Sequence, residues 1–445
     1  MALGRGQGGW VEVLGLATYL ASALSLAFLV PGGTSPDELG HVTYVLALAS
    51  GQGLPLPGQQ THLRVAGGEQ RYVSAQSHHP PVYYALLVPV SLALGNQPGL
   101  VCGVARLLGV VFGLGAILLA RAAARIVLPE HASAIALGVL LSSTFVTYQI
   151  VMASANNETL AVLLVALAIY CAARLIASPS VSPRQCFLMG LLLGLAVDAK
   201  LTAAVAVVPV TAVLVAAHHA ERSCRRTAGL ALAALVGATL VAAPWYVPYA
   251  LQSGSVAFNT AFRPAFTTPW GILAMPGDSA AVVIAIAEEL VCGLWWPNWL
   301  LRDWPSSLYS WLLGGADLSG YGGQVAAELA QIAALVAGGL GVLAFMRGLD
   351  RSAEGDARKR IFLRALAWLL PVVFVGVVWQ ALLVDVWVAR WAARYTPVAL
   401  PALGILLGVG YARLLPARYA RAGALAIALA SVAVNCLALH RLALR

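Results

Sequence analysis

The chain has 445 residues, of which 60% are apolar and only 10% are charged, and its mean hydropathy is +0.83. Soluble globular proteins carry about 25% charged and 45–50% apolar residues. So few charges could not cover a surface in water, which largely excludes soluble enzymes, disordered chains and nucleic-acid-binding proteins. The net charge of +9 does not indicate DNA binding, because the basic residues lie in short loops between apolar stretches.

The first apolar run, 13–30, follows a short start that contains Arg5. Pro31-Gly32-Gly33 comes directly after it, and many further apolar runs follow. A cleaved signal peptide has a shorter apolar region and a small-residue cleavage site. We therefore predict an uncleaved transmembrane helix here.

The next apolar run, 82–95, has 14 residues and contains Pro89. It is too short to span a bilayer, which predicts a re-entrant or interfacial helix. Everything from 32 to about 100 then lies on one side of the membrane. Ten further spans follow, which with the first make eleven: 101–120, 132–150, 157–174, 185–197, 201–217, 228–249, 324–346, 363–384, 396–412 and 422–439.

The distribution of charge supports this topology. One set of loops holds 17 of the 27 basic residues, the other set holds 9, and Arg106 lies inside a span. The positive-inside rule places the richer set in the cytoplasm. Counting 82–95 as a crossing would move most of the later Arg-rich loops outside, so that crossing is rejected. The equally short run 185–197 is kept by the same rule.

These choices predict an all-α polytopic membrane protein with a single integral domain over 1–445. Its first part, 1–250, contains the long outer loop 32–100. Its second part, 251–445, contains a Trp-rich outer loop, 251–322, and the C-terminal helices. Loops of this length are usually functional or disordered.

The first outer loop opens with Thr34-Ser35-Pro36-Asp37-Glu38-Leu39-Gly40-His41. A helix start explains much of it, with Ser35 as N-cap and Glu38 three residues later completing a capping box. Asp37 is explained less well. It lies on one helical face with His41 and Tyr44, so a functional carboxylate and a simple cap both remain open.

The same loop ends in Gln76-Ser77-His78-His79-Pro80-Pro81-Val82-Tyr83-Tyr84. Neighbouring histidines could bind a metal, but the prolines favour an extended segment in which the two side chains diverge. The other interpretations are a polar pocket lining that includes His79 and Tyr83, and a solvated loop. The six cysteines are far apart, and no spacing resembles a zinc site or a disulfide framework.

Two further groups lie at the predicted outer side. Asn156-Asn157-Glu158 is either a helix cap or a second acid that faces Asp37. Lys200 either extends harmlessly to the interface or holds a phosphate as a point charge. Arg106 lies in the outer half of its span, and Arg390, Arg394 and Tyr395 precede the span 396–412. Cations should be depleted on this side, so their presence predicts an anionic ligand.

Other patterns indicate packing or exclude functions. Three G-x-x-x-G pairs, at 109/113, 190/194 and 404/408, predict close helix contacts. The sequence has no P-loop and no G-x-S-x-G nucleophile motif, which argues against ATP-driven pumping and serine hydrolase chemistry.

The motifs, in this order, resemble the polyprenyl-phosphate-sugar-dependent glycosyltransferases of the GT-C fold, which include protein O-mannosyltransferases and aminoarabinose transferases. The matching pieces are Pro36-Asp37-Glu38 with His41, His79 to Tyr84, Arg106, Asn156 to Glu158, Leu193 to Lys200, and Ala393 to Pro397. Each motif is weak alone, and their order over most of the chain makes the match fairly specific. The chain ends at the membrane, so we expect no appended soluble domain to select the acceptor.

The resemblance implies a GT-C-like bundle that moves a sugar from a polyprenyl phosphate to a hydroxyl of a glycan, lipid or protein outside the inner (plasma) membrane. Asp37 matches the family's base, with Glu38 and His41 beside it, and a single base predicts inversion. His79, Tyr83, Asn157, Glu158 and Tyr395 would contact substrate, and Lys200, Arg106 and Arg394 would hold the phosphate. No cofactor is required by the sequence, and a divalent metal at the second acid is left open.

A secondary transporter or flippase of lipid-linked glycans is the alternative function. Transporters place their charges near the midplane and contain internal repeats. Here the charges gather at one edge and no repeat is visible. A purely structural partner would leave the aligned acid and cations unexplained.

Overall fold

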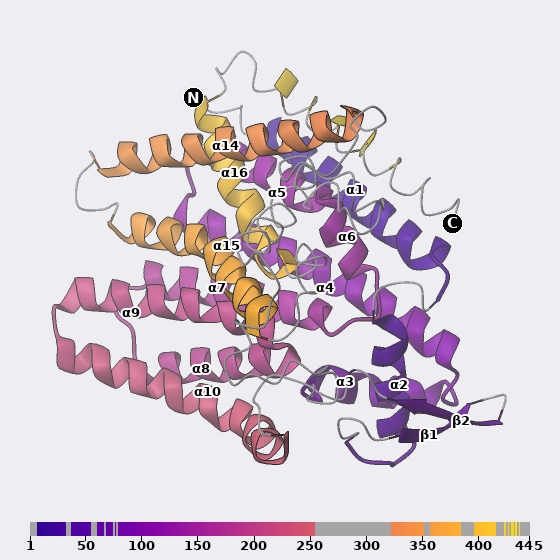
Figure 1. The fold of residues 1–445 in the computed structure, drawn as a ribbon. Helices are drawn as coiled ribbons and strands as arrows, with labels where there is room; N and C mark the ends of the chain where they lie inside the picture. Colours follow the sequence, from indigo (N-terminus) through magenta and orange to yellow (C-terminus); the bar gives the residue numbers. More distant parts are fainter. Residues whose placement is uncertain are drawn as a thin grey trace.

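The computed structural model is a bundle of long helices (Figure 1) and describes residues 7–32, 37–54, 60–65, 68–73, 76, 79–253, 322–350, 357–383, 396–414 and single positions between 422 and 436. The helices are α1 (Gln7–Leu29), α2 (Glu38–Ala49), α3 (Val82–Ala93), α4 (Pro98–Val127), α5 (Ala132–Thr144), α6 (Val146–Met152), α7 (Glu158–Ala177), α8 (Pro183–Ala199), α9 (Val207–Glu221), α10 (Cys224–Ser253), α14 (Gly322–Asp350), α15 (Ala357–Leu383) and α16 (Leu400–Leu414). A 3-10 turn, Leu201–Ala206, leads into α9.

The protein is a multi-pass membrane protein. Within the described ranges, five helical segments are long and apolar enough to cross a bilayer: α1, α4, α7, the 3-10 turn with α9, and α10. The pair α5 and α6 is a sixth candidate, bent by 61° at a break between them. Helices also occupy the predicted spans 185–197, 324–346 and 363–384. The total of eleven spans remains a prediction.

The segment between α1 and α4 lies at one end of the bundle. It contains α3, which has only 12 residues and agrees with the predicted short helix at 82–95. The helices α2 and α3 pack against each other beside an antiparallel hairpin, β1 (Gln60–Val65) and β2 (Gly68–Val73), at the lower right of Figure 1. We call this end of the bundle the α2 end.

The hairpin corrects the all-α prediction. Gln60 pairs with Val73 and Val65 pairs with Gly68. Polar and apolar residues alternate from His62 to Val65, and two glycines follow before a second short segment, which is a weak hairpin signal. A hairpin of this length contains no long apolar run and is therefore invisible to a search for membrane spans.

Glycines bring several helices into close contact, as the G-x-x-x-G pairs predict. A Cβ on Gly190 would collide with the backbone of Ala234, and one on Gly194 would lie 2.7 Å from the carbonyl oxygen of Ala238. Gly237 makes the reciprocal contact with the backbone of Phe187. The packing prediction for this pair is therefore confirmed, and α8 lies against α10.

The other two glycine pairs behave in the same way. Gly109 and Gly113 pack against Met152 of α6, and Gly404 and Gly408 pack against the α5 backbone near Gly138. Small residues let backbones approach closely, which replaces the hydrophobic driving force that is missing between helices in lipid.

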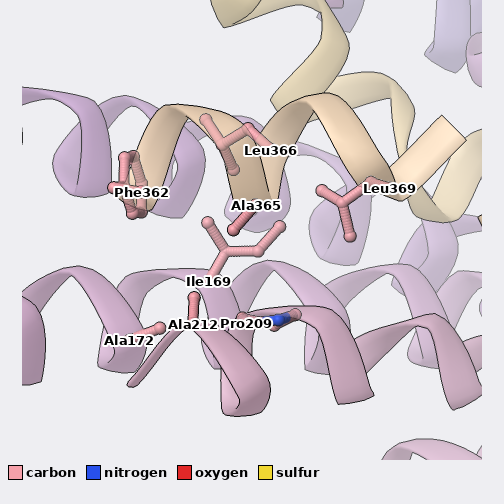
Figure 2. A pocket seen from close by; sticks show the side chains of 8 residues that line it. All are labelled: Ile169, Ala172, Pro209, Ala212, Phe362, Ala365, Leu366 and Leu369. Atoms are coloured by element: carbon pink, nitrogen blue, oxygen red, sulfur yellow. The ribbon is translucent and has the colours of Figure 1, made fainter. Parts of the chain in front are cut away.

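A small cavity lies where α15 crosses α7 and α9 (Figure 2). Its lining side chains are all apolar: Ile169, Ala172, Pro209, Ala212, Phe362, Ala365, Leu366 and Leu369. It offers no side-chain group that could hold a charged substrate. The candidate polar residues lie at the α2 end instead.

Candidate functional site

A buried ion pair ties the start of α2 to α4. Arg106 donates from Nε to Glu38 Oε1 at 2.7 Å and from Nη2 to Oε2 at 2.6 Å. Its other N–H groups donate to the carbonyl oxygens of Ala27 and Val30, at 3.0 and 2.6 Å from Nη1, and of Pro31, at 3.0 Å from Nη2. A guanidinium has five N–H donors. The five bonds use them, cap the last turn of α1, and leave none for a phosphate oxygen.

The predicted capping box is wrong. The helix α2 begins at Glu38, not at Pro36, and Asp37 instead of Ser35 occupies the N-cap position, without a side-chain capping bond. Glu38 is only 1% exposed, and its carboxylate faces Arg106 instead of the helix start. Pairing with a cation distant in sequence therefore replaces the local cap. Ser35 and Pro36 lie outside the described residues.

Asp37 has a backbone conformation that few residues adopt. Its φ is 62° and its ψ is −1°, in the left-handed region. Asp tolerates this region better than most residues, but strained positions of this kind cluster at functional sites. Asp37 is solvent-exposed, whereas the neighbouring Glu38 is buried. The backbone thus turns two adjacent acids in different directions.

Aromatic and imidazole rings fasten α2 to α3. His41 Nδ1 and Tyr84 Oη share a hydrogen bond of 2.8 Å, and the His41 ring stacks on Tyr84 and on His79 at centroid distances of 5.8 Å. Tyr44 stacks on Tyr84 at 3.8 Å and donates to the backbone oxygen of His79 at 3.3 Å. His41 and Tyr44 thus lie on one face of α2, as predicted, and both belong to a buried cluster. Asp37 precedes this face by one turn.

The buried phenol of Tyr84 in this cluster has a perturbed pKa. Burial raises the pKa of Tyr84 well above its usual value, and the neighbouring Tyr44, Tyr83 and Asp37 raise it further. Tyr84 therefore stays neutral at physiological pH and can donate its proton in a hydrogen bond. A negative charge on Asp37 and a neutral phenol are compatible in this arrangement.

Tyr83 and His79 lie in the same region. Tyr83 is 2% exposed, and its ring lies nearly perpendicular to the rings of His41 and Tyr84. His79 is half-buried. His78 lies outside the described residues, so the predicted divergence of the two histidines is not described.

A second buried ion pair joins the start of α7 to the end of α8. Lys200 Nζ lies 2.7 Å from Glu158 Oε2, and both side chains are nearly inaccessible. Thr202 donates to Glu158 Oε1 at 3.3 Å. Asn157 Nδ2 donates to the carbonyl oxygen of Ala199 at 2.9 Å. These contacts clamp the turn after α8 onto the start of α7.

Asn157 occupies the N-cap position of α7 without a side-chain capping bond, and the side chain before it, Asn156, bonds the first turn instead. Asn156 Oδ1 accepts a hydrogen bond of 2.8 Å from the backbone N–H of Glu158. The side-chain bond that the capping interpretation predicts thus comes from Asn156, while Asn157 and Glu158 reach across to α8.

The loop between α6 and α7 connects the two ion pairs. The backbone N–H of Ala155 donates to Glu38 Oε1 at 2.9 Å, and three residues later Glu158 contacts Lys200. The structure therefore brings together Glu38, Arg106, Asn157, Glu158 and Lys200, which are up to 162 positions apart. Arg394 and Tyr395 lie outside the described residues.

The sequence prediction did not select Asp198 as a site residue. Asp198 is 6% exposed, and no other described residue hydrogen-bonds its Oδ1. The signal that could have selected it is an acid on the same helical stripe as Gly190 and Gly194, one turn further on.

The buried acids do not suit a divalent metal. Glu38 is occupied by Arg106 and Glu158 by Lys200, and a cation beside each acid opposes metal binding. Among the described residues, no group of three His, Cys, Asp or Glu side chains could hold a metal ion.

The comparisons with known proteins agree with the motif resemblance. Residues 78–247 match the family model described as dolichyl-phosphate-mannose-protein mannosyltransferase, which confirms the resemblance over less than half of the chain. This segment runs from His78 through α3 to α10 and includes Arg106, Glu158 and Lys200. No curated protein matches the chain.

Several solved structures have weak similarity to this chain. ArnT from Cupriavidus metallidurans bound to undecaprenyl phosphate is 16% identical, with a TM-score of 0.41 over 91% of this chain and 77% of that one. The Archaeoglobus fulgidus oligosaccharyltransferase in its apo form is 13% identical, with a TM-score of 0.47 over 96% of this chain and 56% of that one. AglB from the same organism, in complex with an inhibitory peptide and a dolichol-phosphate, is 13% identical with a TM-score of 0.44, over 96% and 55%.

Proposed function

We propose that this protein is a membrane glycosyltransferase that moves a sugar from a polyprenyl phosphate to an acceptor hydroxyl, with Asp37 as the general base. The family match carries the reaction class, since the family's name contains a lipid-phosphate sugar donor. The observation that carries the role of Asp37 is its exposure. Glu38 and Glu158 are buried against cations, whereas Asp37 faces solvent in a strained conformation.

The chemistry follows from these positions. Asp37 takes the proton of the acceptor hydroxyl as the oxygen attacks the anomeric carbon, and the bond from that carbon to the phosphate oxygen breaks. A single displacement inverts the configuration at the anomeric carbon. The departing phosphate gains charge, and nearby cations stabilise it. Lys200 is the described cation for this role, with Arg394 as a second one from the sequence prediction.

Arg106 has a different role in this proposal. Because its five N–H groups are bonded to Glu38 and to the end of α1, it holds the loop that presents Asp37. Arg106 is thus a positioning residue and not a phosphate ligand.

Substitution of Asp37 tests the proposal. Asp37→Asn keeps the size of the side chain and removes the base, so we expect transfer to fall by roughly 10²–10⁴-fold. The exposed position predicts an unchanged thermal unfolding midpoint. Transfer of a radiolabelled sugar from a polyprenyl phosphate by the purified protein measures the effect. Glu130→Gln, at another exposed acid, is the matched control and should retain full activity. Near-normal turnover in Asp37→Asn would remove Asp37 from the mechanism.

We also infer that the α2 end faces outside the cell at the inner (plasma) membrane. The Arg-rich loops lie on the other side of the predicted spans, and the positive-inside rule places them in the cytoplasm. Single cysteines at Gly68 and Gly99 should then both react with an impermeant maleimide in intact cells, and a cysteine at Arg225 should not. Reaction of only one of the first two would overturn the predicted topology.

A further inference from the structure

The contact between α8 and α10 ends in two buried polar atoms, Asp198 Oδ1 and Trp245 Nε1, that form no hydrogen bond within the described residues. The two helices run in parallel, because Gly190 meets Ala234 and Gly194 meets Ala238 and Val241. One turn further along each helix, Asp198 follows Gly194 and Trp245 follows Val241. The register therefore places Asp198 and Trp245 at the same level of the contact.

A hydrogen bond supports this register. Tyr246, the residue after Trp245, donates from Oη to the carbonyl oxygen of Val197 at 3.0 Å. Its hydroxyl proton is therefore used on the backbone and is not available to Asp198. Tyr246 thus ties α10 to the last turn of α8 beside Asp198.

The orphan atoms are complementary to a ligand. Within the described part of the chain, neither Asp198 Oδ1 nor Trp245 Nε1 has a hydrogen-bond partner, although both atoms are buried. A buried carboxylate oxygen without a partner destabilises a fold. Asp198 also lies in the last turn of α8, where the helix dipole disfavours an anion. Packing does not explain this acid, whereas a ligand that donates a hydrogen bond to Oδ1 would explain it.

The surrounding side chains define the chemistry of that ligand. Trp245 stacks on Tyr249 with ring centroids 5.7 Å apart. A carboxylate accepts hydrogen bonds, an indole N–H donates one, and aromatic rings present apolar faces. A saccharide matches this set, since each sugar has hydroxyl donors, oxygen acceptors and apolar C–H faces.

We propose that Asp198 and Trp245 form the subsite that selects the sugar of the donor. This inference rests on the proposed function, in which Lys200 binds the lipid phosphate. Lys200 follows Asp198 by two residues, so their Cα atoms are at most about 7 Å apart. A sugar joined to a phosphate at Lys200 is then within reach of Asp198. A hydroxyl or amino group of the sugar donates to Asp198, and a sugar oxygen accepts from Trp245.

Binding of two lipids tests the subsite. Undecaprenyl phosphate and mannosyl-phosphoryl-undecaprenol share the phosphate and the tail, and differ in the sugar. We expect the wild-type protein to bind the glycosylated lipid more tightly. Asp198→Asn and Trp245→Phe should each reduce this preference by roughly 10-fold, about the effect of one lost hydrogen bond to a charged or buried group. Binding of undecaprenyl phosphate should stay unchanged. Trp368→Phe, at a tryptophan 62% exposed on α15, is the matched control.

Thermal unfolding without ligand separates the subsite from a structural pair. If Asp198 and Trp245 bind only each other, either variant lowers the unfolding midpoint, and this outcome overturns the proposal. If they bind sugar, Asp198→Asn keeps or raises the midpoint, because a buried unpaired charge is removed.

The remaining outcomes are also distinct. Equal sugar preference in wild type and variants overturns the subsite and leaves the proposed function intact. A change in the Michaelis constant of the acceptor alone assigns these residues to the acceptor and overturns the donor assignment. Failure of the wild-type protein to bind either lipid overturns the proposed function and the subsite with it.

Discussion

The two ends of the pair α1 and α4 carry the same chemistry in different surroundings. At one end, Glu12 of α1 accepts hydrogen bonds from Arg121 and Arg125 of α4. At the α2 end, Arg106 of α4 holds the last carbonyl oxygens of α1 and the carboxylate of Glu38. The arginine side chains are 27% and 46% exposed at the first end, and 4% exposed at the second.

This difference in exposure changes what each pair does. Exposed ion pairs contribute about 0–1 kcal/mol, since water solvates both partners when they separate. Water cannot solvate the partners of a buried pair in this way. Removing one partner therefore leaves a buried charge whose desolvation cost is not offset. The Glu12 carboxylate is itself only 9% exposed, but water reaches both of its arginines, and one arginine still pairs with it when the other is removed. Loss of one arginine at this end should therefore cost little. The Arg106 cluster fixes the end of α1 relative to the start of α2, where the side chain of Asp37 is exposed to solvent.

The largest effect on stability is expected for Arg106→Met. This change strands the buried Glu38 and uncaps α1, which should cost about 3–5 kcal/mol. Thermal unfolding in detergent and the amount of protein in membranes measure it. Glu38→Gln in the same chain removes the stranded charge, so the double variant should recover part of the loss. An Arg106→Met protein of normal stability with weakened phosphate binding would contradict the positioning role and restore Arg106 as a phosphate ligand.

Lys200→Met is expected to have an intermediate effect and to act on function as well as stability. The methionine keeps an apolar stem and removes the cation from Glu158. If Lys200 contacts the lipid phosphate, the Michaelis constant for the donor should rise by roughly 10-fold or the turnover number should fall. Steady-state kinetics with the purified protein distinguish the two. Lys200→Met combined with Glu158→Gln restores charge balance. Full activity of that double variant would show that Lys200 serves only as a partner of Glu158.

The smallest effect is expected for Arg121→Met. It is the same substitution in the same helix as Arg106→Met, at the exposed end, and Arg125 still pairs with Glu12. We expect a loss of at most about 1 kcal/mol in the free energy of unfolding. Thermal unfolding measured beside Arg106→Met gives the ratio directly. Equal losses for the two variants would mean that burial does not distinguish the two ends.

Much of the helical framework could be predicted from the sequence. Apolar runs of about 20 residues form α-helices in a bilayer, because the backbone must satisfy its own hydrogen bonds there. The short helix α3 followed from the length of its run, and the close contacts at Gly190 and Gly194 followed from their spacing. The role of Asp37 stays a prediction from the sequence, and the capping box from which it was argued does not form.

The partners of the charged side chains were decided only by the tertiary structure. Glu38 follows the local pattern of a capping residue, yet it binds Arg106, 68 positions away. Arg106 resembles a phosphate ligand in the sequence, yet α1 and α2 use all of its donors. The physical reason is that ion pairs depend on distance and burial, and these arise when helices far apart in sequence pack together. Periodicity describes one helix at a time and contains no information on which charges meet.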